Sequence, residues 1–215
     1  MKKLSCITII IVSTFSLTHA AVFNVGPGGG YDFSEIQAAI NIANNGDTIY
    51  VSPGTYNENV NFNNKLLTLQ STAGADKTII AGTGGTTVTV SNAARIEGFT
   101  ISGGTASFGA GLCVNGNGTV ITKNIFQFNH EGAGGYGAAI GGNSASPIIS
   151  GNIFRNNSAD SQWLSGVVSF INSSSPQIEN NIFYQNETRA INFTVPQNAQ
   201  PLVVNNTIVG NDCGI

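Results

Sequence analysis

The amino-acid sequence predicts an all-β fold, a parallel β-helix (a solenoid of about seven coils) with a short capping helix near the N-terminus. Three observations predict it: the composition, a repeat of short β-type segments, and one segment with helical spacing. Only 9% of the residues are charged, glycine occurs 27 times, and asparagine is equally frequent. Because 41% of the chain is still hydrophobic, this composition is typical neither of a helical bundle nor of a disordered chain. It favours short strands joined by many turns.

The charge balance excludes one class of partner. The formal net charge is -3, and the chain has no cluster of basic residues. A nucleic-acid-binding surface has to neutralise phosphates with lysine and arginine, so we expect no nucleic-acid partner.

The repeat consists of an aliphatic residue, two small or polar residues, asparagine, any residue, and then phenylalanine or isoleucine. Its five copies begin at Ile96, Ile121, Ile149, Ile178 and Val203, and the first copy has Phe99 in place of the asparagine. The copies follow one another at 25, 28, 29 and 25 residues. Strands of three to five residues are too short for independent hairpins, and a coil of this length built from short strands and turns is a rung of a parallel β-helix.

The repeat aligns two columns of asparagine. The first column is Asn124, Asn152, Asn181 and Asn206, and the second is Asn129, Asn157, Asn186 and Asn211. Such an asparagine can adopt a left-handed backbone conformation, and its amide can bond to the asparagines above and below. Each bond contributes only about 1 kcal/mol, but it recurs with every rung. We interpret both columns as structural ladders, and we expect Phe126, Phe154 and Phe183 to stack inward.

Residues 33–44 have helical spacing, with Ile36, Ala39, Ile40 and Ala43 on one face. Ser34 and Gln37 suggest a capping box at the start of this helix. The turn residues at 44–46 predict its end, and a strand is expected at residues 48–51.

Residues 1–20 are typical of a secretory signal peptide, with Lys2 and Lys3, an apolar stretch around Ile9–Val12, and small residues before position 21. This leaves residues 21–215 as a single parallel β-helix domain with no transmembrane segment. We expect a secreted, periplasmic or cell-surface protein, and the signal is bacterial in style.

An oxidising compartment permits a disulfide, and the sequence leaves open whether Cys113 and Cys213 pair.

The last residues, Gly214-Ile215, resemble the opening of another rung, and no polar cap follows them. Because solenoids need capped ends, we expect the domain to be truncated or uncapped at its C-terminus. Missing sequence or a docking partner would then cover the open coil.

The opening segments carry a resemblance to a known superfamily. They are Phe33-x-x-Ile36-Gln37-x-Ala39-Ile40, Gly46-Asp47-Thr48-Ile49 and Pro53-Gly54-Thr55-Tyr56-x-Glu58-Asn59-Val60. They resemble the opening of the pectin lyase-like, right-handed parallel β-helix superfamily, and the Asn-Ile-Phe coils resemble its repeats. The resemblance covers nearly all of residues 31–215 and implies a right-handed coil with a helix over its first turn. The superfamily includes pectate lyases, pectin esterases, polygalacturonases, alginate epimerases, phage tailspikes and surface adhesins, so the fold alone does not determine a function.

Each enzyme class in that superfamily implies a particular set of charged residues. A lyase-like site would need several acids to hold calcium and a basic residue, and an esterase-like site would need two close aspartates with an arginine. The acids of the repeating coils are scattered: Glu97, Glu131, Asp160, Glu179, Glu187 and Asp212. No catalytic residue is identified, no metal site has suitable spacing, and no cofactor is expected, calcium being possible only for a lyase.

The candidate binding site follows the second asparagine column, where His130, Ser158, Glu187 and Asp212 succeed one another. Two neighbouring coils have long loops here, and an aromatic face beside acids is a common way to grip sugars. The candidate glycan-binding residues are His130, Glu131, Tyr136, Asp160 and Trp163. Alternatively, Trp163 covers the side of the solenoid and the acids face water. Arg155 falls in an outward column with Gln127, Tyr184 and Val209.

Two functions therefore remain open. The first is a secreted or cell-surface protein that binds glycans, or has a structural or adhesive role, without catalysis. The alternative is a polysaccharide-degrading or polysaccharide-modifying enzyme resembling pectate lyases and related carbohydrate-active enzymes.

Overall fold

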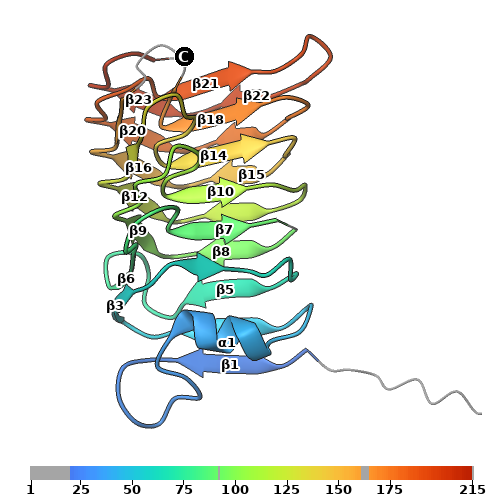
Figure 1. The fold of residues 1–215 in the computed structure, drawn as a ribbon, viewed down its shortest axis with the longest axis vertical. Helices are drawn as coiled ribbons and strands as arrows, with labels where there is room; N and C mark the ends of the chain where they lie inside the picture. The colour runs from blue at the N-terminus through green and yellow to red at the C-terminus, as the bar shows by residue number, and fades with distance from the viewer. Residues whose placement is uncertain (1–19, 92, 161–164, 215) are drawn as a thin grey trace, which may run out of the picture.

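The computed structural model describes residues 20–91, 93–160 and 165–214. The predicted signal peptide, except for residue 20, lies outside these residues. The described part of the chain contains one helix and 23 strands, all short. Figure 1 shows these strands stacked in successive coils from β1 and α1 at one end to β21–β23 at the other. The all-β parallel solenoid of about seven turns is thus confirmed.

Three parallel sheets run along the solenoid. The first sheet is, in order, β1 (Val22–Val25), β2 (Thr48–Val51), β5 (Thr68–Ser71), β8 (Arg95–Glu97), β11 (Val120–Thr122), β15 (Ile148–Ser150), β19 (Gln177–Glu179) and β22 (Leu202–Val204). The second is β3 (Gly54–Asn57), β6 (Thr78–Ala81), β9 (Thr100–Ser102), β12 (Ile125–Gln127), β16 (Ile153–Arg155), β20 (Ile182–Tyr184) and β23 (Thr207–Val209). The third is β4 (Val60–Asn61), β7 (Val88–Val90), β10 (Leu112–Val114), β14 (Ile140–Asn143), β18 (Val168–Ile171) and β21 (Ile191–Thr194).

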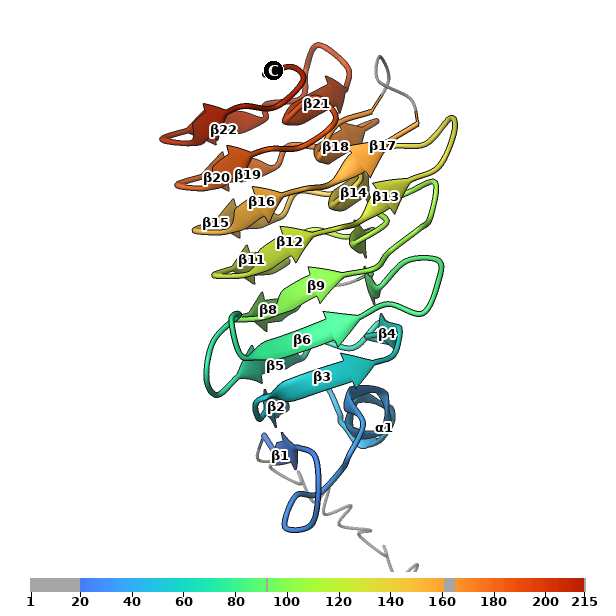
Figure 2. The same cartoon turned by 90° about the vertical axis from the view of Figure 1, so that its left-hand side faces the viewer.

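A small additional sheet pairs β13 (His130–Glu131) with β17 (Ser158–Ala159). It lies beside the second sheet, which faces the viewer in Figure 2. The strands pair in the register that the repeat predicts, because Ile121 lies opposite Ile149 in the first sheet and Phe126 lies opposite Phe154 in the second. One copy of the repeat is therefore one coil.

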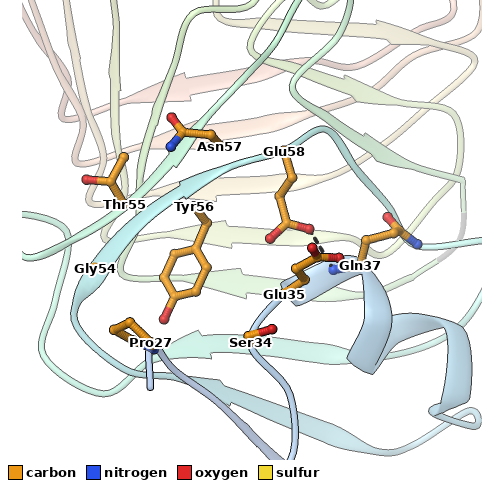
Figure 3. A pocket seen from close by; sticks show the side chains of 9 residues that line it. All are labelled: Pro27, Ser34, Glu35, Gln37, Gly54, Thr55, Tyr56, Asn57 and Glu58. Carbon is orange, nitrogen blue, oxygen red and sulfur yellow. Dashed lines mark hydrogen bonds between the residues drawn. The ribbon is translucent and has the colours of Figure 1, made fainter. Parts of the chain in front are cut away.

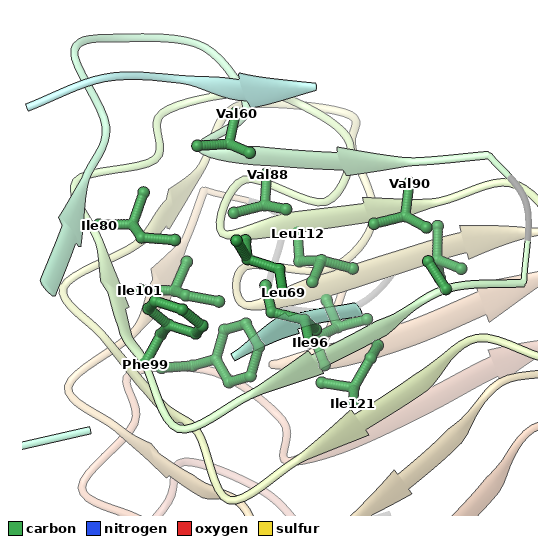
Figure 4. Packing of buried hydrophobic residues seen from close by; sticks show 14 of the residues in the cluster. Val60, Leu69, Ile80, Val88, Val90, Ile96, Phe99, Ile101, Leu112 and Ile121 are labelled. Atoms are coloured by element: carbon green, nitrogen blue, oxygen red, sulfur yellow. The ribbon is translucent and has the colours of Figure 1, made fainter. Parts of the chain in front are cut away.

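The interior of the solenoid is apolar. In the coils shown in Figure 4, side chains from the three sheets point toward one another. They include Leu69, Ile96 and Ile121 of the first sheet, Ile80 and Ile101 of the second, and Val88 and Leu112 of the third, all fully buried. Farther along, the rings of Phe126, Phe154 and Phe183 form the predicted inward stack, with centroids 5.1 and 4.5 Å apart and planes 11° from parallel.

The asparagine ladders are also confirmed. The Oδ1 atom of Asn152 accepts the backbone N–H and the Nδ2 of Asn124, at 2.9 and 3.2 Å. The Nδ2 of Asn152 donates to the carbonyl of Ile121 at 2.9 Å and to Oδ1 of Asn181 at 3.0 Å. Asn206 continues this column, and the second column repeats the pattern through Asn129, Asn157, Asn186 and Asn211. These buried amides therefore have the partners that burial requires.

The left-handed backbone does not lie at the ladder residues, so that part of the prediction is wrong. Positive φ angles occur one residue earlier: at Lys123, Asn180 and Asn205 before the first column, and at Phe128, Asn156 and Gln185 before the second. The residue ahead of each ladder asparagine makes the bend, and the asparagine itself then directs its amide into the solenoid. Glycines take the same bend in other coils, at positions 98, 151, 103 and 210.

The N-terminal helix α1 spans Ile36–Ile42, which is shorter than predicted, and it packs against β1, β2 and β4. The predicted capping box is wrong, because the residue before the helix makes no side-chain capping bond. Instead, both carboxylate oxygens of Glu58 accept hydrogen bonds at 2.8 Å, from the backbone N–H groups of Ile36 and Gln37. The side chain of Gln37 is used elsewhere, where its Oε1 accepts the N–H of Asn61 at 2.7 Å.

Both cysteines in the described residues are free thiols, with Cys113 buried and Cys213 exposed. Burial raises the pKa of the Cys113 thiol, against a hydrogen bond from Asn115 that lowers it. No helix of the described chain is long and apolar enough to cross a membrane.

Candidate functional site

Two of the residues predicted to bind a ligand lie together on the outside of the solenoid. His130 Nε2 is 3.3 Å from Asp160 Oδ1, and both side chains are about half exposed, at 45% and 52%. On its other side, His130 Nδ1 lies 2.9 Å from the hydroxyl of Ser158, which it faces across the pairing of β13 and β17. The two neighbouring coils therefore present these groups side by side, as expected.

Two other predicted residues, Glu131 and Tyr136, do not join this pair. Glu131 is fully buried, because successive residues of a strand point to opposite sides and His130 faces outward. A glycan at the surface cannot reach this carboxyl group, so its assignment as a binding residue is corrected. Tyr136 packs edge-to-face against Phe108, with ring centroids 6.4 Å apart. Trp163 lies outside the described residues.

The environment of Glu131 favours its neutral form. Burial raises the pKa of this carboxyl group, and the nearby Asp160 carboxylate acts in the same direction. The Ser165 hydroxyl, the Gly135 N–H and His130 act the other way. Among the described residues, however, none makes a hydrogen bond of good geometry to either carboxylate oxygen.

This raised pKa predicts that Glu131 lowers the stability of the folded protein more at neutral pH than at acidic pH. The unfolded carboxyl group has a pKa of about 4.3, and below that value it is neutral in both states. As pH rises through the higher pKa of the folded state, the protein has to bury a charge or retain a proton, so stability falls. Glu131→Gln is therefore expected to raise the unfolding temperature at pH 7.5 and to change it little at pH 4. Exposed Glu187→Gln, the control, should show no such difference, and a less stable Glu131→Gln at pH 7.5 would contradict the prediction.

A larger polar surface surrounds His130. Three neighbouring coils each contribute three outward residues. The first is the last residue of a strand of the second sheet, the second lies at the left-handed corner, and the third directly follows an asparagine of the second ladder. We call these nine residues the corner face: Gln127, Phe128, His130, Arg155, Asn156, Ser158, Tyr184, Gln185 and Glu187. In each coil, a buried ladder asparagine comes between the second and the third of these residues and holds the coils in register.

A groove of about 420 Å³ runs along the corner face. Its lining consists of Phe128, His130, Asn156, Ser158, Gln185 and Glu187. It thus combines an aromatic ring with amide, hydroxyl, imidazole and carboxylate groups, which is the mixture that recognises polyhydroxylated ligands.

Arg155 is held in place beside the groove. Its Nε donates to Gln127 Oε1 at 2.8 Å, and its Nη1 donates to the Tyr184 hydroxyl at 3.1 Å. All three residues are partly exposed. A guanidinium group has five N–H donors, so these two bonds orient the group while others remain to contact a ligand.

Phe128 has an unusual conformation. Its side chain is 62% exposed and its φ is 54°, at a corner where other coils have Gly103 or Gly210. A bulky residue in this backbone region costs about 1–2 kcal/mol, and an exposed ring recovers little of that by packing. The bend belongs to the solenoid, but a bulky, exposed ring at this strained position has no packing role, and this is a sign of function. Sequence reasoning missed Phe128, Asn156 and Gln185, although Phe128 could have been noticed as the only aromatic residue directly before the second asparagine column.

Three charged groups on or next to the first sheet pair with one another. Glu97 accepts hydrogen bonds from Arg95 at 2.6 Å and from Lys123 at 2.8 Å. Burial alone would raise the pKa of Glu97, but these two cations together hold it below its ordinary value. The described residues contain no group of three or more His, Cys, Asp or Glu placed to hold a metal ion.

A second hollow, of about 350 Å³, lies at the N-terminal end beside the start of α1 (Figure 3). Its polar groups already stabilise the first coil. Glu58 caps the helix, and the Tyr56 hydroxyl donates to the carbonyl of Ser52 at 2.8 Å. Burial raises the pKa of Tyr56, and Tyr31 and Glu58 act in the same direction. We assign this hollow to the architecture of the first coil.

Comparisons with known proteins show which solved structures have a similar fold. A search of curated proteins finds no match. Among solved structures, the chain is similar to pectin methylesterase from carrot, with 14% identity and a TM-score of 0.54 over 83% of this chain and 65% of the carrot enzyme. Pectin methylesterase PemA from Erwinia chrysanthemi is similar at 14% identity and a TM-score of 0.50, over 82% of this chain and 67% of that one. The chain thus spans about two thirds of the carrot enzyme, and at this identity the likeness shows the fold alone.

A family model agrees with the predicted handedness of the coil. The model described as right handed beta helix region matches residues 66–215, which is more than half of the chain. The matched segment includes all five copies of the repeat, both asparagine ladders and the corner face. The chain therefore belongs to the right handed beta helix family.

Proposed function

We propose that the protein is a secreted or cell-surface β-helix protein that binds a glycan on the corner face. The observation that carries this proposal is Phe128, an exposed aromatic ring held in a strained backbone conformation beside the groove. The likeness in fold to enzymes named for pectin also supports a carbohydrate ligand. Export is supported by the N-terminal sequence.

The corner face has the groups that sugar binding needs. Phe128 offers an apolar surface to the C–H face of a sugar ring. Gln185 and Asn156 can donate and accept hydrogen bonds to hydroxyl groups, and Arg155 is already oriented. Neighbouring coils are spaced by about 4.8 Å, so the three coils present these groups along roughly 10 Å of the solenoid. A chain of sugars lying along the groove would contact all three.

The test is a binding screen of the exported chain, residues 21–215, against neutral and acidic polysaccharides by affinity electrophoresis. Phe128→Ala is expected to weaken binding about 10-fold or more, because loss of a stacking ring removes on the order of 1.4 kcal/mol. Leu66→Ala is the matched control, since Leu66 is also an exposed apolar residue but lies away from the corner face. Wild-type protein that binds no polysaccharide, or a Phe128→Ala variant that binds like wild type, would refute the proposal.

A further inference from the structure

Three side chains of the two-stranded sheet form a continuous polar chain. The Ser158 hydroxyl lies 2.9 Å from His130 Nδ1, and His130 Nε2 lies 3.3 Å from Asp160 Oδ1. His130 and Ser158 are paired across β13 and β17, and Asp160 follows two residues after Ser158. Each of the paired strands begins directly after a buried ladder asparagine, Asn129 or Asn157, so the backbones that carry this chain are fixed.

The arrangement determines where the imidazole proton lies. A neutral imidazole has one nitrogen that donates and one that accepts. The Asp160 carboxylate can only accept, so it favours the tautomer with the proton on Nε2. The other nitrogen, Nδ1, then has its lone pair directed at the Ser158 hydroxyl. This is the relation between acid, base and nucleophile that activates a serine, and such constellations are recognised by geometry and role rather than by fold.

We propose that Ser158 is the nucleophile of an acyl-transfer site, with His130 as its general base and Asp160 as the residue that positions the imidazole. The substrate class is a carboxylic ester, such as an O-acyl group on a sugar. The groove has room for it, because Ser158 and His130 both line the space of about 420 Å³. The amides of Asn156 and Gln185 line the same groove, and such amides are the kind of donor that stabilises a developing oxyanion.

The reaction balances without a metal or redox partner. The Ser158 oxygen attacks the ester carbonyl carbon while its proton passes to His130 Nδ1. The bond from that carbon to the alcohol oxygen then breaks, the alcohol leaves with the proton, and the acyl group stays on Ser158. A water molecule repeats the sequence: it gives a proton to His130, takes the acyl group as the free acid, and leaves Ser158 protonated again.

The test is labelling of the exported chain with a fluorophosphonate, a probe for activated serines, followed by peptide mass spectrometry. One adduct is expected, on Ser158, and its rate should depend on pH because the general base has to be neutral. Ser158→Ala should abolish the label, and His130→Gln should slow it about 100-fold or more. Asp160→Asn should slow it and shift the pH profile, whereas a role in packing alone would leave that profile unchanged.

Ser150→Ala is the matched control, since Ser150 is also a partly exposed serine on a strand, but its hydroxyl bonds to Thr122 at 3.4 Å. This variant should label like wild type, and unfolding temperatures should show that every variant is folded. Absence of label on folded wild-type protein, or equal labelling of the His130→Gln variant, would overturn the proposal. The probe needs no glycan, so label on Ser158 without polysaccharide binding would refute only the proposed function, and binding without label would refute only this inference.

Discussion

Asn157→Ala is expected to lower the unfolding temperature by about 10 °C. The Oδ1 of Asn157 accepts the backbone N–H and Nδ2 of Asn129, at 3.1 and 3.0 Å, and its own Nδ2 donates to Asn186 Oδ1 at 2.9 Å. The substitution leaves the buried N–H of Asn129 without a partner, which costs about 1–3 kcal/mol. Asn129 Nδ2 and Asn186 Oδ1 each keep another bond, to the carbonyl of Ile101 and from the N–H of residue 157, so each lost bond there costs about 1 kcal/mol. A total near 3–4 kcal/mol corresponds to roughly 10 °C for a domain of this size.

The measurement is thermal unfolding followed by circular dichroism at pH 7. Asn143→Ala is the matched control, because Asn143 is an exposed asparagine on β14 whose Oδ1 accepts a hydrogen bond from Asn172 at 2.8 Å. This surface change should cost less than about 0.5 kcal/mol. A fall of only one or two degrees in Asn157→Ala would mean that water or a shifted backbone replaces the ladder bonds, and the ladder would then not be a main source of stability.

The periodic part of the fold could be predicted from the sequence because the same coil is repeated. Once Ile121 and Ile149 are recognised as equivalent, parallel stacking brings them opposite each other, and the structure pairs them in this way. The same reasoning placed Phe126 and Phe154 in the interior. No knowledge of distant contacts was needed, since each coil mainly contacts its neighbours.

Features that depend on one particular contact between coils could not be predicted in this way. Ser34 and Gln37 have the spacing of a local capping box, but Glu58 reaches the same N–H groups from the next coil. A local pattern cannot reveal this competitor, because Glu58 comes 22 residues after Ile36. The left-handed corners were misplaced for a related reason. The side chain of a ladder asparagine has to point inward, and the residue in the left-handed conformation is therefore the one before it.

The candidate site was predicted in part. The repeat correctly brought His130 next to Ser158 and Asp160, because all three follow the second asparagine column in adjacent coils. Glu131 was misjudged because the alternation along a two-residue strand was not applied to it. Phe128 was missed because its importance lies in a strained φ angle, which appears only when the coil is built.

Phe154→Ala is expected to cost about 3–5 kcal/mol, which also corresponds to roughly 10 °C or more. The ring is fully buried between Phe126 and Phe183, with centroids 5.1 and 4.5 Å away. The coils on either side are tied together by both asparagine ladders, so the backbone cannot collapse into the space that the ring leaves. Phe128→Ala removes the same ring from the surface of the neighbouring coil and should change the unfolding temperature by no more than a few degrees.

The double variant, Phe154→Ala with Asn157→Ala, separates the two contributions. If the ladder is what keeps the cavity open, breaking it lets the coil relax, and the double variant should be less destabilised than the sum of the two single variants. If the costs simply add, the aromatic stack and the ladder stabilise the coil independently. A Phe154→Ala variant that unfolds within about two degrees of wild type would contradict the packed stack itself, because a fully buried ring between two others cannot be removed from a close-packed interior without loss.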